Sequence, residues 1–203
     1  RERLYNIHAD PLQTNNVADK YPGVVDDLLQ QYNEYWEELQ MENIPYPRPV
    51  IGTEYLETTF LSPEDWVRDK GVHTWNQRHV IAGVNNNGFW PVNISHQGTY
   101  QFEVRRWPAE LDHPIPSGLP EHVDQGITRL GEPVRMDEGK AIPVQKIRIK
   151  VGEQEMEENI AAGQTKVLFE MTLDPGNKNI RTWMIDEKGN EQGAYYVYAK
   201  KVN

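Results

Sequence analysis

The sequence has 203 residues, of which 37% are hydrophobic and 26% are charged, and its formal net charge is −10. Six tryptophans and ten tyrosines supply enough apolar surface for a folded core, which argues against a disordered chain. The negative charge argues against broad binding to nucleic acids or anionic membranes, because both require a positive surface. Because the chain lacks cysteine, disulfides, cysteine nucleophiles and thiolate metal sites are excluded.

Residues 1–42 predict a strand, a loop and a helix. Polar and apolar residues alternate briefly over 3–7, which predicts a strand, and Asp10-Pro11 opens a turn. Pro22 suits the first turn of a helix, and the apolar residues after it recur at helical spacing over 22–40. This apolar stripe consists of Val25, Leu28, Leu29, Tyr32, Trp36 and Leu39. We expect the stripe to pack on another surface.

The proline-rich stretch 43–49 predicts an extended linker and the main boundary of the chain. From Val50 onward the hydrophobic period becomes two, which is typical of half-buried antiparallel strands. The inward sets are Tyr100, Phe102 and Val104; Ile147, Ile149 and Val151; and Val167, Phe169, Met171 and Leu173. We therefore expect a mainly β protein, with a jelly-roll-like antiparallel β-sandwich over 50–203 after the strand-loop-helix segment. Residues 108–141 predict a long surface loop that carries one short strand.

The sequence predicts no catalytic or metal site. It contains no nucleophile elbow, phosphate loop or dinucleotide fingerprint. His8 and Asp10 supply two of the three or four ligands that a metal needs, and His73 and His79 match no standard ligand spacing. The acidic run 153–158 lacks the spacing and glycine of a calcium loop, so we interpret it as a solvated face or loop.

Four tryptophans lie in the first half of the β region, at positions 66, 75, 90 and 107. An exposed indole can stack on a sugar ring, but for each tryptophan taken alone we favour the core. Arg105, Arg106 and Trp107 are our candidate ligand-binding residues, because they close a predicted strand and lead into the long loop. Strand alternation predicts one arginine inside, paired with a carboxylate, and the other facing solvent or an acidic ligand. A purely structural ion pair is the alternative.

Residues 3–18 read Arg-Leu-Tyr-Asn-Ile-His-Ala-Asp-Pro-Leu-Gln-Thr-Asn-Asn-Val-Ala. This segment resembles the end of the sulfatase catalytic domain, where Glu-Leu-Tyr-Asp-Leu, Asp-Pro and Glu-x-x-Asn-Leu-Ala follow one another, with Gln13 where glutamate is commoner. A proline-started helix with a tryptophan near its end follows in that family, similar to 22–36. The β region resembles an extra segment of some bacterial arylsulfatases in its pieces 90–94, 98–108, 139–143 and 194–198.

The catalytic motif of that family has no counterpart here. Sulfatases use a formylglycine made in Cys/Ser-x-Pro/Ala-x-Arg, beside a bound calcium. This chain has no cysteine, and the segments that begin at Ser62, Ser95 and Ser117 lack both the Pro/Ala and the Arg. The resemblance thus implies a non-catalytic C-terminal fragment: residues 1–42 would end the catalytic domain, and 50–203 would be an accessory sandwich.

The implied partner of this fragment is the catalytic domain of a parent sulfatase. The sandwich would stabilise that domain or shape its substrate cleft. A sulfated glycan is a further possible ligand, and the resemblance places the enzyme in the periplasm or outside the cell. Formylglycine and calcium would belong to the parent, with no cofactor in this chain. The alternative is an autonomous carbohydrate-binding module, which an aromatic-lined open groove would favour.

Overall fold

The computed structural model describes residues 2–41, 46–69, 73–129 and 132–203. The chain divides into an N-terminal unit, Arg1–Tyr46, and a sandwich unit, Pro47–Asn203. Part of the predicted linker, 43–45, lies outside the described residues, and 46–49 contains neither helix nor strand.

The N-terminal unit holds a closed loop, a short 3-10 turn η1 (Ala18–Lys20) and the helix α1 (Pro22–Met41). The predicted helix over 22–40 is confirmed. The predicted strand over 3–7 is wrong, since that segment has no regular secondary structure. A strand needs a partner strand for its backbone groups. Here the backbone of Leu4 instead bonds Asn16 and Val17 within the loop.

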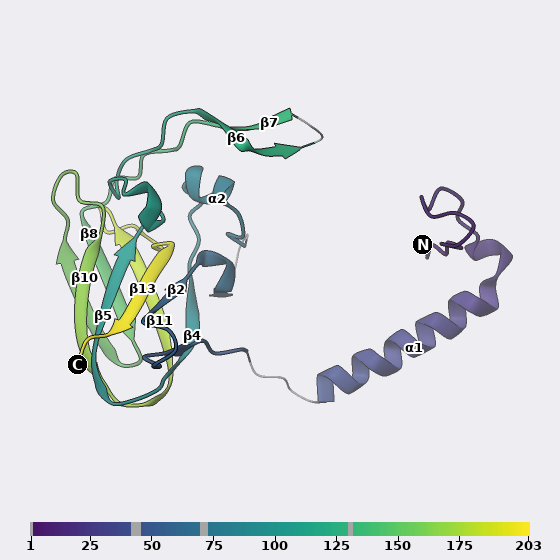
Figure 1. Ribbon diagram of the computed structural model, residues 1–203, viewed down its shortest axis with the longest axis horizontal. Coiled ribbons are helices and arrows are strands. Elements are labelled where there is room, and N and C mark those ends of the chain that lie inside the picture. Colours follow the sequence, from purple (N-terminus) through teal and green to yellow (C-terminus); the bar gives the residue numbers. More distant parts are fainter. Residues whose placement is uncertain (1, 42–45, 70–72, 130–131) are drawn as a thin grey trace. The chain divides into compact units, whose positions relative to one another are not determined.

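Two sheets of the sandwich unit form its layers, beside a separate two-stranded sheet, and the predicted mainly antiparallel β-sandwich is confirmed (Figure 1). The first sheet has the order β1 (Val50–Ile51), β4 (Gly88–Ile94), β11 (Gly176–Ile185), β8 (Lys146–Val151) and β9 (Gln154–Asn159), with β3 (Val67–Arg68) on β4 and β12 (Glu191–Gln192) on β11. The second has the order β10 (Val167–Leu173), β5 (Gly98–Arg105), β13 (Tyr196–Lys201) and β2 (Thr58–Leu61). Short helical segments are η2 (Pro63–Asp65), α2 (Gln77–Ile81) and η3 (Ala109–Leu111).

The core of the sandwich consists of the period-two residues that the sequence predicted. Along β10, for example, Val167, Phe169, Met171 and Leu173 are buried while the residues between them are exposed. The predicted inward sets of β5 and β8 belong to the same buried cluster. Burial of apolar side chains from both sheets is the main force that holds the two layers together.

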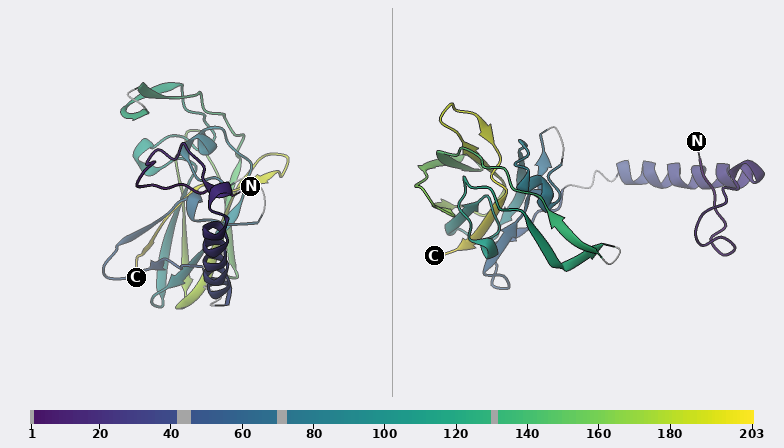
Figure 2. Two further views of the ribbon diagram at one scale, coloured as in Figure 1. Left: turned by 90° about the vertical axis from the view of Figure 1, so that its right-hand side faces the viewer. Right: turned by 90° about the horizontal axis from the view of Figure 1, so that it is seen from above.

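The segment 108–141 differs from its prediction. It carries two strands, β6 (His122–Arg129) and β7 (Glu132–Met136), which pair as an antiparallel hairpin and project from the sandwich (Figure 2). Its flanks are partly buried: Ile115 belongs to the core cluster, and Gly139 is also buried. Residues 113–119 are therefore half-buried or buried, whereas Gly139 is buried between exposed neighbours.

The acidic run forms β9 at the edge of the first sheet, and the residues of this strand are exposed. Glu157 pairs with Lys146 at 2.8 Å and Glu155 with Arg148 at 3.7 Å, both across to β8. Charged side chains on an edge strand oppose pairing with another chain. The solvated face that the sequence predicted is confirmed.

Candidate functional site

Arg105 is the last residue of β5, and its side chain is buried in an ion-pair cluster. Its guanidinium donates to Glu103 and, at 3.2 Å, to Asp112, while Glu103 also pairs with Lys166 at 3.2 Å. Burial alone would raise the pKa of Glu103, but Arg105 and Lys166 outweigh it and hold that pKa below its usual value. Arg105 is thus the arginine that pairs with carboxylates.

Arg106 is completely buried and has no carboxylate partner among the described residues. Its guanidinium donates to the carbonyl oxygens of Lys140 at 2.5 Å, Ser117 at 3.1 Å and Ile115 at 3.4 Å. Burial lowers the pKa of Arg106 to about 10. The carbonyl oxygens carry only partial charge, so this cation is held by a cage of dipoles.

Trp107 is also buried; its Nε1 donates to the Ser117 carbonyl oxygen at 3.2 Å, and its ring lies 4.4 Å from the Arg106 guanidinium carbon. The prediction of an outward-facing arginine is therefore wrong. Arg106 continues the inward phase of Tyr100, Phe102 and Val104. Arg105 lies on the opposite side of β5 beside Glu103, and it is buried because the loop after the strand folds back over it and places Asp112 against it. Arg105, Arg106 and Trp107 lie together but present no open surface to a ligand.

The pieces that carry the arylsulfatase resemblance contact one another, directly or through one intervening residue, inside the sandwich unit. Arg106 in piece 98–108 bonds Lys140 in piece 139–143, and β5 pairs with β13, which holds most of piece 194–198. Trp66 lies 5.4 Å from Trp90 and 5.9 Å from Tyr195, which connects pieces 90–94 and 194–198. The recurring pieces are thus packing elements of the sandwich in this chain.

In the N-terminal unit, two side chains of the sulfatase-like segment close its loop. Asn16 Oδ1 accepts from the Leu4 backbone N–H at 2.9 Å, and the Leu4 carbonyl accepts from Val17 at 2.8 Å. Asp10 accepts from the Asn15 backbone N–H at 2.7 Å, which holds the pKa of Asp10 below its usual value. Asp10 is therefore a turn residue, as the sequence predicted, and the loop delivers the chain to α1.

The apolar stripe of α1 is exposed. Leu28, Leu29, Tyr32 and Trp36 are between 41% and 59% exposed, although the sequence predicted that they pack on a surface. Tyr32 and Trp36, one turn apart, stack with ring centroids 6.3 Å apart. Exposed apolar area of this kind on one helix face is typical of an interaction surface.

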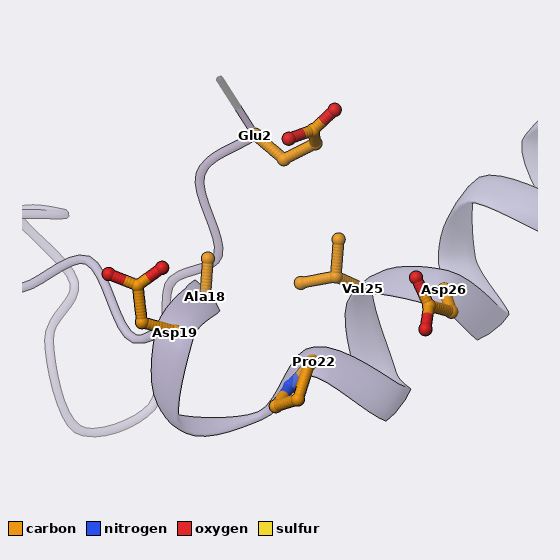
Figure 3. Close-up of a pocket in the computed structure, with 6 residues that line it drawn as sticks. All are labelled: Glu2, Ala18, Asp19, Pro22, Val25 and Asp26. Carbon is orange, nitrogen blue, oxygen red and sulfur yellow. The ribbon is translucent and has the colours of Figure 1, made fainter.

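A hollow of about 260 Å³ lies between the loop and the start of α1 (Figure 3). Ala18, Pro22 and Val25 line it, together with the carboxylates of Glu2, Asp19 and Asp26. These negative charges would repel a sulfated or other anionic ligand. In the described residues, moreover, no group of three or more histidine and acidic side chains is arranged to hold a metal ion.

A larger groove of about 430 Å³ lies on the sandwich unit beside α2. Trp75 and Phe60 are exposed at this groove, and Tyr196 and Gln77 also line it. Sequence reasoning placed Trp75 in the core, which holds for Trp66, Trp90 and Trp107 but not for Trp75. One feature of the sequence could have shown that Trp75 is exposed. Trp75 directly precedes Asn76, the N-cap of α2, so it lies on neither a strand nor a helix face that would bury it.

No described helix is long and apolar enough to cross a membrane. No family model and no curated protein matches the sequence. Among solved structures, a ruminal GH26 endo-β-1,4-mannanase aligns at 12% identity over 75% of this chain and 27% of its own, with a TM-score of 0.37. This chain thus spans well under a third of that protein's length, and a likeness this weak carries no functional argument.

Proposed function

We propose that this chain is the non-catalytic C-terminal part of a sulfatase. In this proposal the N-terminal unit completes the catalytic domain, and the sandwich unit is an accessory domain that stabilises it or shapes its substrate cleft. The exposed apolar stripe of α1 carries the proposal, because a 20-residue amphipathic helix gains most of its stability from packing that stripe on a partner. The catalytic domain is the partner that the sequence resemblance supplies.

The sulfatase-like segment supports the same partner. Asp10 and Asn16 stand where the resemblance places the Asp of Asp-Pro and the Asn of Asn-Leu-Ala, and their side chains close the loop that leads into α1. A segment of this sequence is therefore suited to hold α1 at a defined angle against a neighbouring surface. Formylglycine and calcium would belong to that neighbour, since the formylglycine motif does not occur in this chain.

The test is assembly in trans. The upstream catalytic part, expressed without this chain, should melt at a higher temperature and stay in solution when the full 203-residue chain is added. The double variant Leu28→Glu with Trp36→Glu should abolish that gain, because it places charges on the stripe. Gln31→Glu adds a charge on an exposed position off the stripe and serves as the matched control. Equal stabilisation by all three chains would refute docking through α1.

A further inference from the structure

The groove beside α2 presents one large aromatic face to solvent. Trp75 is 58% exposed, and its ring meets the His79 ring edge-on at 5.9 Å between centroids and 84° between planes. His79 lies on α2, so the indole is braced by a helix. An exposed indole matches the apolar C–H face of a sugar ring. Because the His79 ring already restricts the orientation of Trp75, binding costs little conformational entropy at this side chain.

Polar groups surround this aromatic face. The Gln77 side-chain amide donates to the Tyr196 hydroxyl at 2.9 Å, which fixes the amide at the groove wall. The Gln77 side chain is exposed to solvent, so the rest of its amide can be reached from the groove. Sugar hydroxyls both donate and accept hydrogen bonds, so they suit this amide.

The charge of the groove selects against anionic sugars. Among the described residues that line it, Glu64 is the one charged side chain, and neither lysine nor arginine contributes. The chain as a whole carries −10. A sulfated or carboxylated ring would therefore meet repulsion without a compensating cation. The volume of about 430 Å³ lies within the range of about 300–1,000 Å³ that is typical of small-ligand sites.

We propose that this groove binds an uncharged sugar ring of a glycan, stacked on Trp75 and hydrogen-bonded by the Gln77 amide. The inference does not depend on the proposed sulfatase function. It places a glycan site on the sandwich unit at residues other than Arg105, Arg106 and Trp107, and it assigns to that site a neutral rather than a sulfated ligand.

Calorimetric titration of the full chain with cellohexaose, laminarihexaose and xylohexaose tests the proposal, each sugar being used also after chemical O-sulfation. At least one neutral sugar should bind with a Kd of about 1 mM or tighter, and sulfation should weaken its binding. Trp75→Ala should weaken binding at least tenfold without changing the melting temperature. Tyr55→Ala, which removes an aromatic ring that is 90% exposed outside the groove, should bind like the unaltered chain.

Three results would overturn the proposal. They are no binding of any neutral hexaose at about 10 mM, tighter binding of the sulfated sugars, or unchanged affinity in Trp75→Ala. Indole N–H signals in a nitrogen–proton correlation spectrum add an independent readout. The signal that is missing from Trp75→Ala should be the one that shifts most when the sugar is added.

Discussion

Arg106 donates a hydrogen bond of 2.5 Å to the carbonyl oxygen of Lys140, which joins the end of β5 to the segment that precedes β8. The same guanidinium bonds the Ser117 carbonyl, so one buried cation connects three stretches that are distant in sequence. A buried charge without a counter-ion is costly unless polar groups surround it. The cage around Arg106 therefore requires that all of its carbonyls be held in place.

Arg106→Met should lower the free energy of unfolding by about 2–4 kcal/mol, because the carbonyl oxygens of Ile115 and Lys140 lose their donor and Ser117 keeps only Trp107. Urea denaturation of the full chain measures this change. Arg135→Ala is the control, since its pair with Glu121 is exposed on both sides and should be worth less than about 1 kcal/mol. If the proposed parent sulfatase is isolated, both variants should leave its KM unchanged. A raised KM for Arg106→Met at unaltered stability would contradict the structural role.

Gly118 and Gly139 lie in close contact beside the cage. A Cβ on Gly118 would stand 1.8 Å from the Gly139 carbonyl oxygen, so an alanine forces the two backbones apart. Gly118→Ala should therefore destabilise the sandwich by about 1–3 kcal/mol, measured as a lower urea midpoint. Gly23→Ala in α1 meets nothing within 4 Å and should leave the sandwich transition where it is. Equal midpoints for the two variants would show that the contact is unimportant.

Much of the sandwich could be predicted from sequence, because a hydrophobic period of two residues directly reflects which side of a strand is buried. Phe102, Ile149 and Phe169 were placed correctly for this reason. The rule failed at Arg105, which is out of phase with the inward residues of β5 and is still buried, and at 3–7, where alternating residues have no partner strand. The groove at Trp75 could not be found because its other members, Phe60 and Tyr196, come from strands far apart in the chain.

Because two tyrosines are buried, we expect the folded chain to lose stability at alkaline pH. Burial raises the pKa of Tyr196 from 10.0 to about 12 and raises that of Tyr195 further. In the unfolded chain both tyrosines ionise near pH 10. Their contribution to the free energy of unfolding is therefore complete below pH 10 and is lost as the pH rises toward 12. Arg106 acts in the opposite direction. Because its pKa is lowered to about 10, the folded chain loses the buried charge of Arg106 as the pH rises through this range, and the cost of burying that charge disappears. The two tyrosines outweigh it.

The free energy of unfolding should therefore fall between about pH 10 and about pH 12. The check is a series of urea titrations across that range, with absorbance at 295 nm to follow tyrosinate. The free energy of unfolding of Tyr196→Phe should fall less steeply with pH. It should start about 1 kcal/mol lower, because Gln77 loses its hydrogen-bond acceptor. Stability that rises through this range, or the same slope in the variant, would argue against burial of these hydroxyls.

The isolated chain should not hydrolyse sulfate esters. It contains no cysteine, and none of its serines lies in a formylglycine motif, so it offers no activated nucleophile for this chemistry. Incubation of the purified chain with 4-nitrophenyl sulfate and calcium should release no nitrophenol above the buffer rate. Calcium-dependent turnover that copurifies with the chain would overturn the assignment as a non-catalytic part.

The coding sequence upstream of the Arg1 codon tests the central claim most directly. The proposal predicts a continuous reading frame that encodes a catalytic domain with a Cys/Ser-x-Pro/Ala-x-Arg motif and the aspartate and asparagine ligands of a calcium site. Mass spectrometry of the natural protein should then find this chain as the C-terminal end of a longer polypeptide. An upstream frame that encodes no such motif, or a natural protein that begins at or near Arg1, would contradict it.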